Sequence, residues 1–235
     1  METGELKPNT GKQIEITVDG ATYARYPVKT NIVTAQDDMS DVGEKYAKPH
    51  LTPGDMLFIS ERIVAISQGR AYPIKDIHPS PLAKFLVRFV HKSPYGIGLG
   101  SPWTMELAIR EAGAPRMLLA AAAAAVTKPF GLRGVFYHVV GNNINAIDGP
   151  CSYTLPPFNE YAKLGPAKPH AVARTLSEKL GCDVVIIDAN DLGANVLGKS
   201  RKDITDDFCK KAFLDNPLGQ SAEQTPLCIV RKLNT

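Results

Sequence analysis

The sequence has few cysteines and no long apolar run, and both absences limit what the protein can be. The four cysteines lie far apart and form no C-x-x-C pair, so neither a zinc knuckle nor a disulfide framework is indicated: Cys151, Cys182, Cys209 and Cys228. The longest apolar stretch, Met117 to Val126, is about half of the roughly 20 residues that a bilayer helix needs. We therefore expect a cytoplasmic protein with reduced thiols and no membrane partner, in which this stretch forms a packed interior helix.

Several active-site motifs are also absent. There is no G-x-S-x-G motif, so a serine hydrolase of that type is not supported, and no glycine-rich loop ends in the Lys-Ser/Thr of a Walker A motif. The histidines show no metal-ligand spacing. Basic residues are scattered and the net charge is only +3, so no nucleic-acid partner is predicted.

What remains is an ordinary globular composition, with 44% hydrophobic and 22% charged residues over 235 positions. A chain of this length can form one unit over residues 1–235 or two subdomains that share an interface. The proline- and glycine-rich stretch near 78–102 is the place where a seam or an insertion is expected.

The local patterns predict an α+β fold with mixed or antiparallel sheets and packed helices. Asp19-Gly20 between alternating segments predicts a β-hairpin, and residues 37–49 predict a short helix with acidic residues in its first turn. Residues 51–74 are expected to be mainly β. Ser101 and Gly113 suit the two ends of a helix over 102–112. The other expected elements are an alanine-rich helix ending near Lys128-Pro129, a strand over 134–140, a helix over 171–181 and a strand over 183–187.

Polar side chains follow two of these expected strands. The run VVIIDANDLG places Asp188, Asn190 and Asp191 directly after four apolar residues, and Asp148 follows the predicted strand over 134–140. Carboxylate and amide oxygens suit Mg²⁺ or Mn²⁺, which also keep water and substrate phosphate in their coordination shell. The alternative for the run at 188–191 is a capped turn, because Asp and Asn bond readily to nearby backbone. Two such acidic strand ends could converge on one metal.

Cations next to the expected strands could neutralise nucleotide phosphates. Lys29, Arg62 and Arg70 occupy such positions, although solvated surface cations are the alternative interpretation.

Taken together, these segments resemble the coenzyme F-420 gamma-glutamyl ligase family (F-420-0:L-glutamate ligase). YPVKTNIV and LTPGDMLFISERIVAISQGRAYPIKDI resemble the opening of that family, and TMELAIREAG is similar to its next helix. NAID, VVIIDANDLG and DNPLGQSAEQTPLCIVRK are similar to its two aspartate motifs and its C-terminal segment. These blocks occur in the family's order and cover about half of the chain.

The resemblance implies an α+β ligase that joins L-glutamate to a carboxylate of a deazaflavin precursor in a GTP-dependent reaction, with ATP as the alternative nucleotide. It implies Mg²⁺ or Mn²⁺ bridging the phosphates, K⁺ as an additional ion, small-molecule carboxylate and amine substrates, and a homodimer. Carried onto this chain, the metal ligands are Asp148 and Asp191 with Asp188 or Asn190 beside them, and the nucleotide or substrate residues are Lys29, Thr30, Arg62 and Arg70. No catalytic residue is assigned.

The chain also departs from the family pattern. Ala65-Ile66 replaces a serine-lysine pair, Ala194 replaces an arginine, and the segment after the second aspartate motif is shortened. These changes affect the part of the pocket that would select the substrate. They make a catalytically altered protein that binds a nucleotide or a phosphorylated metabolite the alternative function.

Overall fold

The computed structural model describes residues 6–90, 97–132, 134–141, 143–190, 193–220 and 222–233. The chain divides into two compact units, the first formed by residues 1–69 and 166–235 and the second by Arg70–Gly165. The second unit is therefore an insertion between two halves of the first.

The first unit contains a six-stranded sheet with the order β1-β2-β8-β3-β6-β7. Its strands are β1 Glu15–Val18, β2 Ala21–Val28, β3 Met56–Ser60, β6 Asp183–Asn190, β7 Gly193–Lys199 and β8 Leu227–Lys232. Only β3 and β6 run parallel to each other; every other neighbouring pair is antiparallel. A mixed sheet packed with helices is the predicted α+β fold, which is confirmed.

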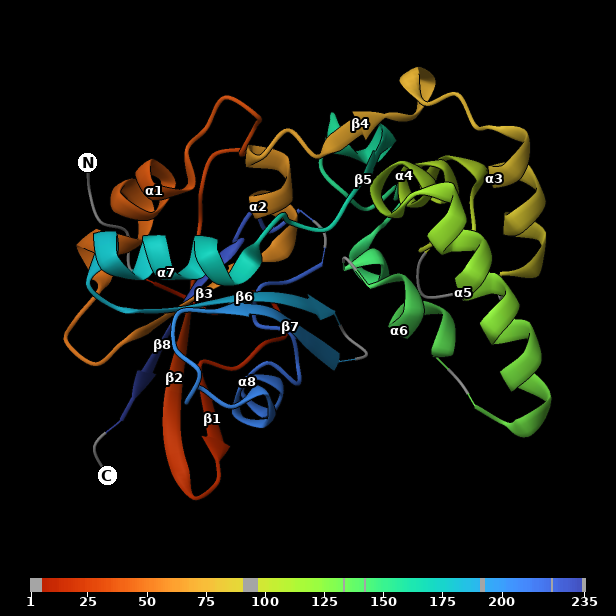
Figure 1. Cartoon of the computed structure of the whole chain (residues 1–235). Coiled ribbons are helices and arrows are strands. Elements are labelled where there is room, and N and C mark those ends of the chain that lie inside the picture. Colours follow the sequence, from red (N-terminus) through yellow and green to blue (C-terminus); the bar gives the residue numbers. More distant parts are fainter. Residues whose placement is uncertain are drawn as a thin grey trace. The chain divides into compact units, whose positions relative to one another are not determined.

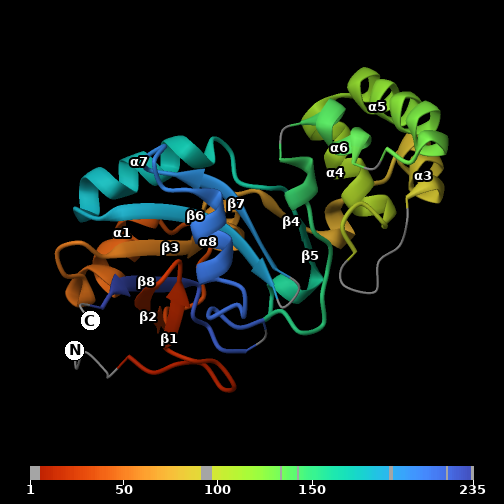
Figure 2. The same cartoon turned by 90° about the horizontal axis from the view of Figure 1, so that it is seen from below.

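Helices cover both faces of this sheet. Figures 1 and 2 show α7 and α8 on opposite sides of it. Because both faces are covered, β6 has four successive fully buried residues, Val184 to Ile187, as expected for a strand without a solvent face. The helical elements of this unit are α1 Met39–Val42, a π-helical turn Gly43–Ala47, a 3₁₀ turn Lys48–His50, α2 Glu61–Ser67, α7 Pro169–Leu180 and α8 Asp206–Ala212.

Several local predictions for this unit are confirmed. Asp19 and Gly20 both have positive φ, as a type I′ turn requires, and they join β1 to β2. The short helix α1 has an acidic residue, Asp41, in its first turn as predicted, and Asp38 caps it by accepting a hydrogen bond from the Ser40 amide. The expectation that residues 51–74 are mainly β is wrong for 61–67, which form α2. All four residues of the apolar run 63–66 are buried. A short continuous apolar run fits a buried strand and a buried helix equally well, so its pattern could not distinguish the two.

The second unit is mainly helical, with one two-stranded sheet. Ser101 forms a capping box at the start of α4 with Thr104, and Gly113 ends the helix, as predicted. The elements are β4 Ala71–Pro73, a 3₁₀ turn Ile74–Asp76, α3 Pro81–Leu86, a 3₁₀ turn Val87–Phe89, α4 Pro102–Ala112, α5 Ala114–Thr127, a 3₁₀ turn Lys128–Phe130, α6 Val135–Val140, two 3₁₀ turns Ile144–Ala146 and Phe158–Glu160, and β5 Tyr161–Lys163.

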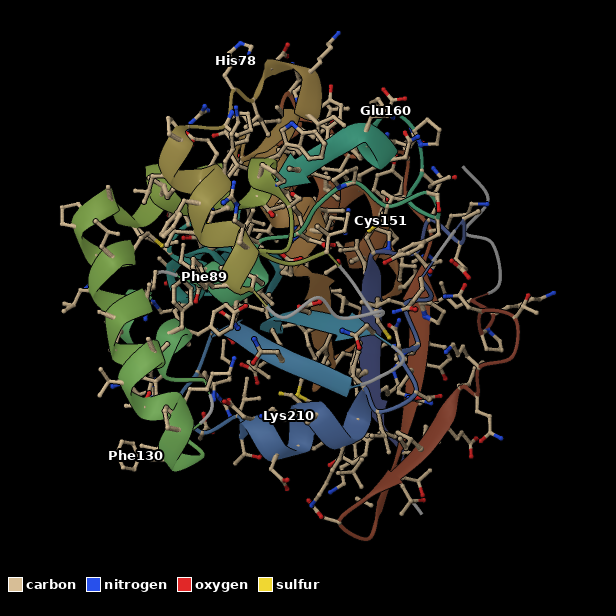
Figure 3. The ribbon with its side chains drawn as sticks, turned by 90° about the vertical axis from the view of Figure 1, so that its right-hand side faces the viewer. His78, Phe89, Phe130, Cys151, Glu160 and Lys210 are labelled. Carbon is tan, nitrogen blue, oxygen red and sulfur yellow. The ribbon has the colours of Figure 1, made fainter. Side chains whose placement is uncertain are left out.

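Two predictions for this unit are wrong. Residues 135–140 form helix α6, not a strand; α6 lies between Gly134 and Gly141 and packs against α5. Helix α5 is not an interior helix, because it buries only Met117 and Ala120 and leaves Leu119 64% exposed. Phe130, at the far end of α5 in Figure 3, is 79% exposed. Within the described ranges, no helix is long and apolar enough to cross a membrane.

Candidate functional site

The parallel pair β3 and β6 directs its carboxyl ends to one margin of the first unit's sheet. We use “edge” for this margin of strand ends, whereas the outermost strands are β1 and β7. Ser60, the last residue of β3, is paired with Ile187, so Glu61 after β3 and Asp188 within β6 lie at the same level of the sheet. In open parallel α/β sheets, ligands bind outside the carboxyl ends of the strands, and β3 and β6 are a parallel pair with this geometry. Glu61 and Arg62 follow β3, and Asp188 follows Ile187, so all three belong to this edge.

Strands β2 and β8 add a third segment to the same edge. Leu227 of β8 pairs with Val28 on one side and with Ile59 on the other, and Ile59 in turn pairs with Ile186. This register forms a row across four strands. Lys29 and Thr30, immediately after Val28, therefore extend beyond the row on the same side as Glu61 and Asp188. The register thus brings Lys29, Thr30, Arg62, Asp188 and Asn190 to one edge; we call this group of residues the sheet edge.

The residues after β2 differ in exposure. Lys29 is exposed, whereas Thr30 is buried. The Thr30 amide donates to the Gln224 carbonyl at 3.0 Å, and its hydroxyl donates to the Asn31 carbonyl at 2.7 Å. Thr30 therefore holds the segment that follows β2 in place, while Lys29 is exposed to solvent, where an anion can reach it.

Strand β3 passes into α2 without an intervening loop. Glu61 is the first residue of this helix and is only 4% exposed, and Arg62 is half-buried. A carboxylate in the first turn of a helix is favoured by the helix dipole. The sequence interpretation named Arg62 and missed Glu61. The available signal was a charged residue placed directly after a buried strand.

The polar run at 188–191 does not follow a strand end as expected. Strand β6 continues to Asn190 and pairs with β7, so that Asp188 is opposite Asn195 and Asn190 is opposite Gly193. Asp188 and Asn190 are both half-buried, and because side chains two residues apart along a strand leave on the same side, they lie on one face of the sheet. Asp191 lies outside the described residues.

In the second unit, Asp148 follows helix α6 and a 3₁₀ turn, not the strand that was predicted. It is half-buried and forms an isolated antiparallel bridge with Lys163. Its Oδ1 accepts a hydrogen bond from the Gly149 amide at 2.8 Å. Lys163, which sequence interpretation also missed, is 4% exposed, and its Nζ donates to the Ala146 carbonyl at 2.8 Å.

Arg70 is tied to its own unit. Its Nη2 lies 2.8 Å from Glu111 Oε1, and its Nε donates to the Gly165 carbonyl at 2.7 Å. The Arg70 carbonyl also accepts from the Leu164 amide. Two sides of the guanidinium group thus serve to join the start and the end of the second unit. A role in substrate binding would have to use the remaining N–H groups.

The predicted metal ligands carry oxygen donors, which Mg²⁺ and Mn²⁺ prefer. Asp188 and Asn190 belong to the first unit, and Asp148 belongs to the second. Burial raises the pKa of Cys182 to about 11 and that of Cys209 to about 12, so these two thiols stay protonated at neutral pH. Within the described ranges, no three His, Cys, Asp or Glu side chains are grouped to hold a metal ion.

The structure is an α+β fold in which polar and charged side chains gather at the sheet edge. Residues 27–191 match the model of the F420-0:Gamma-glutamyl ligase family. Because the match covers more than two thirds of the 235 residues, the chain belongs to this family. The matched range contains every residue of the predicted nucleotide and metal sites. No curated protein matches the chain.

Proposed function

We propose that the protein is an amide ligase that uses a nucleoside triphosphate and a divalent cation to activate a carboxylate for attack by an amine. Family membership supports a gamma-glutamyl ligase kind of function. The observation that carries the proposal is the strand register, which brings two cationic side chains, a hydroxyl, a carboxylate and a carboxamide to the sheet edge. We further propose GTP as the nucleotide, with ATP as the alternative, and a cytoplasmic homodimer as the working form.

Each residue of the sheet edge has a role in this proposal. Lys29, exposed beyond β2, and Arg62, half-buried after β3, bind nucleotide or substrate oxygens by charge-assisted hydrogen bonds. Thr30 fixes the backbone that carries Lys29 through its bond to Gln224. Arg70 orders the second unit through Glu111 and Gly165, with its other N–H groups available to a substrate carboxylate.

Asp148, Asp188, Asn190 and Asp191 would hold the divalent ions, and K⁺ would be a further ion of the site. When bound, a divalent ion neutralises charge that develops on the phosphates during transfer. An oxygen of the substrate carboxylate attacks the γ-phosphorus, and the nucleoside diphosphate leaves. The amine then attacks the carbonyl carbon of the acyl phosphate, inorganic phosphate leaves, and the nitrogen loses a proton.

The test measures phosphate release from GTP and from ATP with Mn²⁺, a carboxylate and L-glutamate. Asp188→Asn and Asp191→Ala should each reduce metal-dependent release to background while the melting temperature stays near that of the parent. Asp76→Asn, a change of an exposed carboxylate in a 3₁₀ turn, is the matched control and should have no effect. Full release by both Asp188→Asn and Asp191→Ala would refute the assignment.

One observation favours the alternative of binding without catalysis. Ala65 and Ile66, at the positions where the resemblance places a serine-lysine pair, are buried in α2 and carry no group that could bind substrate. Calorimetry with GTP and ATP, with and without Mn²⁺, separates the two functions when it is combined with the release assay. Nucleotide binding without phosphate release, whatever carboxylate and amine are supplied, supports the binding protein.

A further inference from the structure

Lys163 is a buried lysine in direct register with Asp148. The amide of each residue donates to the carbonyl of the other, at 3.1 Å from Asp148 to Lys163 and at 2.9 Å in the reverse direction. In an antiparallel pair that exchanges both hydrogen bonds, the two side chains lie on the same face, with Cβ atoms roughly 5 Å apart. The ammonium-bearing chain of Lys163 and the carboxylate of Asp148 therefore leave the backbone on one side.

The side chain of Lys163 also holds the segment that leads to Asp148. Its Nζ donates to the carbonyl of Ala146, two residues earlier, at 2.8 Å. Lysine is rarely this buried, because removing an ammonium group from water is costly. The register places the Asp148 carboxylate on the same face as this ammonium-bearing side chain.

Close packing restricts the same segment from two other sides. A Cβ atom on Gly149 would lie 3.0 Å from the side chain of Ile97, and one on Gly165 would lie 3.0 Å from both Ala146 and the Asn143 carbonyl. The Gly149 amide additionally fixes Asp148 Oδ1. The segment from Ala146 to Gly149 thus has little freedom to move, and Lys163 is the charged group among its restraints.

We propose that Lys163 is a positioning residue that holds Asp148 in the conformation in which its carboxylate binds the divalent ion. This inference rests on the proposed function, because it takes Asp148 as a metal ligand. Outer groups that orient a metal ligand usually matter for affinity, and their loss weakens metal binding by about 10- to 100-fold. Lys163 differs from Arg62 and Lys29 in that it acts through Asp148 and does not bind the nucleotide.

The test is a titration of the full-length protein with Mn²⁺ alone, in which the electron paramagnetic resonance signal of free Mn²⁺ reports binding. Lys163→Met, of similar length and without charge or donor, should raise the half-saturating Mn²⁺ concentration by about 10-fold. Lys75→Met is the matched control, since Lys75 is an exposed lysine of the same unit, and should leave it unchanged. If Lys163→Met does not fold, Lys163→Gln replaces it and should weaken binding in the same direction.

A double-mutant cycle separates positioning from a merely structural role. Asp148→Asn should weaken Mn²⁺ binding, and Lys163→Met added to it should cause no further loss, because Lys163 acts through the carboxylate. Unchanged Mn²⁺ affinity in a folded Lys163 variant, or an equal further loss in the Asp148→Asn background, overturns the inference. If Asp148→Asn itself binds Mn²⁺ like the parent, the metal assignment of Asp148 in the proposed function fails instead.

Discussion

The ion pair between Asp55 and Arg231 gives a quantitative prediction for stability. The Asp55 side chain is 1% exposed, at the start of β3, and Arg231 lies on the neighbouring strand β8. Arg231 donates from Nε to Oδ1 at 2.9 Å and from Nη2 to Oδ2 at 2.8 Å, and the Thr52 amide donates to Oδ2 at 2.8 Å. Replacing Asp55 by Asn keeps the shape of the side chain but removes the charge from this bidentate pair.

Breaking a buried pair by changing one partner usually costs about 3–5 kcal/mol. Arg231 is 31% exposed and can recover some hydration, so we expect the lower end of that range, about 3 kcal/mol, at pH 7. Burial alone would raise the pKa of the Asp55 carboxyl, but the hydrogen bonds from Arg231 and Thr52 outweigh it and hold the pKa below its usual value.

The sign of the pH dependence follows from this lowered pKa. The contribution of the ionised Asp55 is fully present above the pKa that Asp has in the unfolded chain, and it is lost as the pH falls through the lower pKa of the folded state. The stability gap between the parent and Asp55→Asn should therefore be large at pH 7 and shrink in acid. Urea unfolding of the parent and of Asp55→Asn, followed by circular dichroism at pH 7 and again in acid, measures this difference in stability. Asp203→Asn, which breaks the exposed Arg201–Asp203 pair, should leave the urea midpoint unchanged. An Asp55→Asn variant as stable as the parent at pH 7 would refute this reasoning.

Two further predictions concern packing and thiol chemistry. Gly198→Ala should destabilise the protein by about 1–3 kcal/mol or more. The added Cβ would lie 2.6 Å from the Pro169 carbonyl oxygen, a backbone atom that no rotamer change can move. An unchanged melting temperature would contradict this. Burial and the nearby carboxylates of Asp183 and Asp55 raise the pKa of Cys182 to about 11, because they disfavour the thiolate. Its reaction with iodoacetamide, followed by mass spectrometry, should therefore be slow at pH 8, and the rate should rise about 10-fold per pH unit up to that pKa. A rate that levels off near pH 9 would show an ordinary thiol.

The sequence predicted most accurately the elements whose ends are determined by turn or capping residues. The hairpin at Asp19-Gly20 and the helix from Ser101 to Gly113 are determined by local conformational preferences, and both are confirmed. The six residues of α6, VFYHVV, are β-branched or aromatic and suggest a strand by propensity alone. Their packing against α5 decides for helix, which is a tertiary effect that no local pattern contains.

The site shows the same division. Polar residues next to buried strands were recognisable in the sequence, so Lys29, Arg62 and Asp188 could be named as candidates, and their roles stay predictions. Glu61 and Lys163 were missed, because a charged residue beside an apolar run is usually a surface residue. Only the burial of Glu61 and the register between Lys163 and Asp148 distinguish them.

The position of β8 has a consequence for how the protein is made. Residues 227–232 lie between β2 and β3, so the first unit's sheet has a gap in its middle until the ribosome has released them. The inserted unit, residues 70–165, has emerged long before, and domains that emerge early generally fold as they appear. During synthesis a finished helical unit is therefore carried by an open sheet with two unpaired strand edges. A nascent chain halted before residue 227 should attract chaperones at β2 and β3 and leave the insert alone.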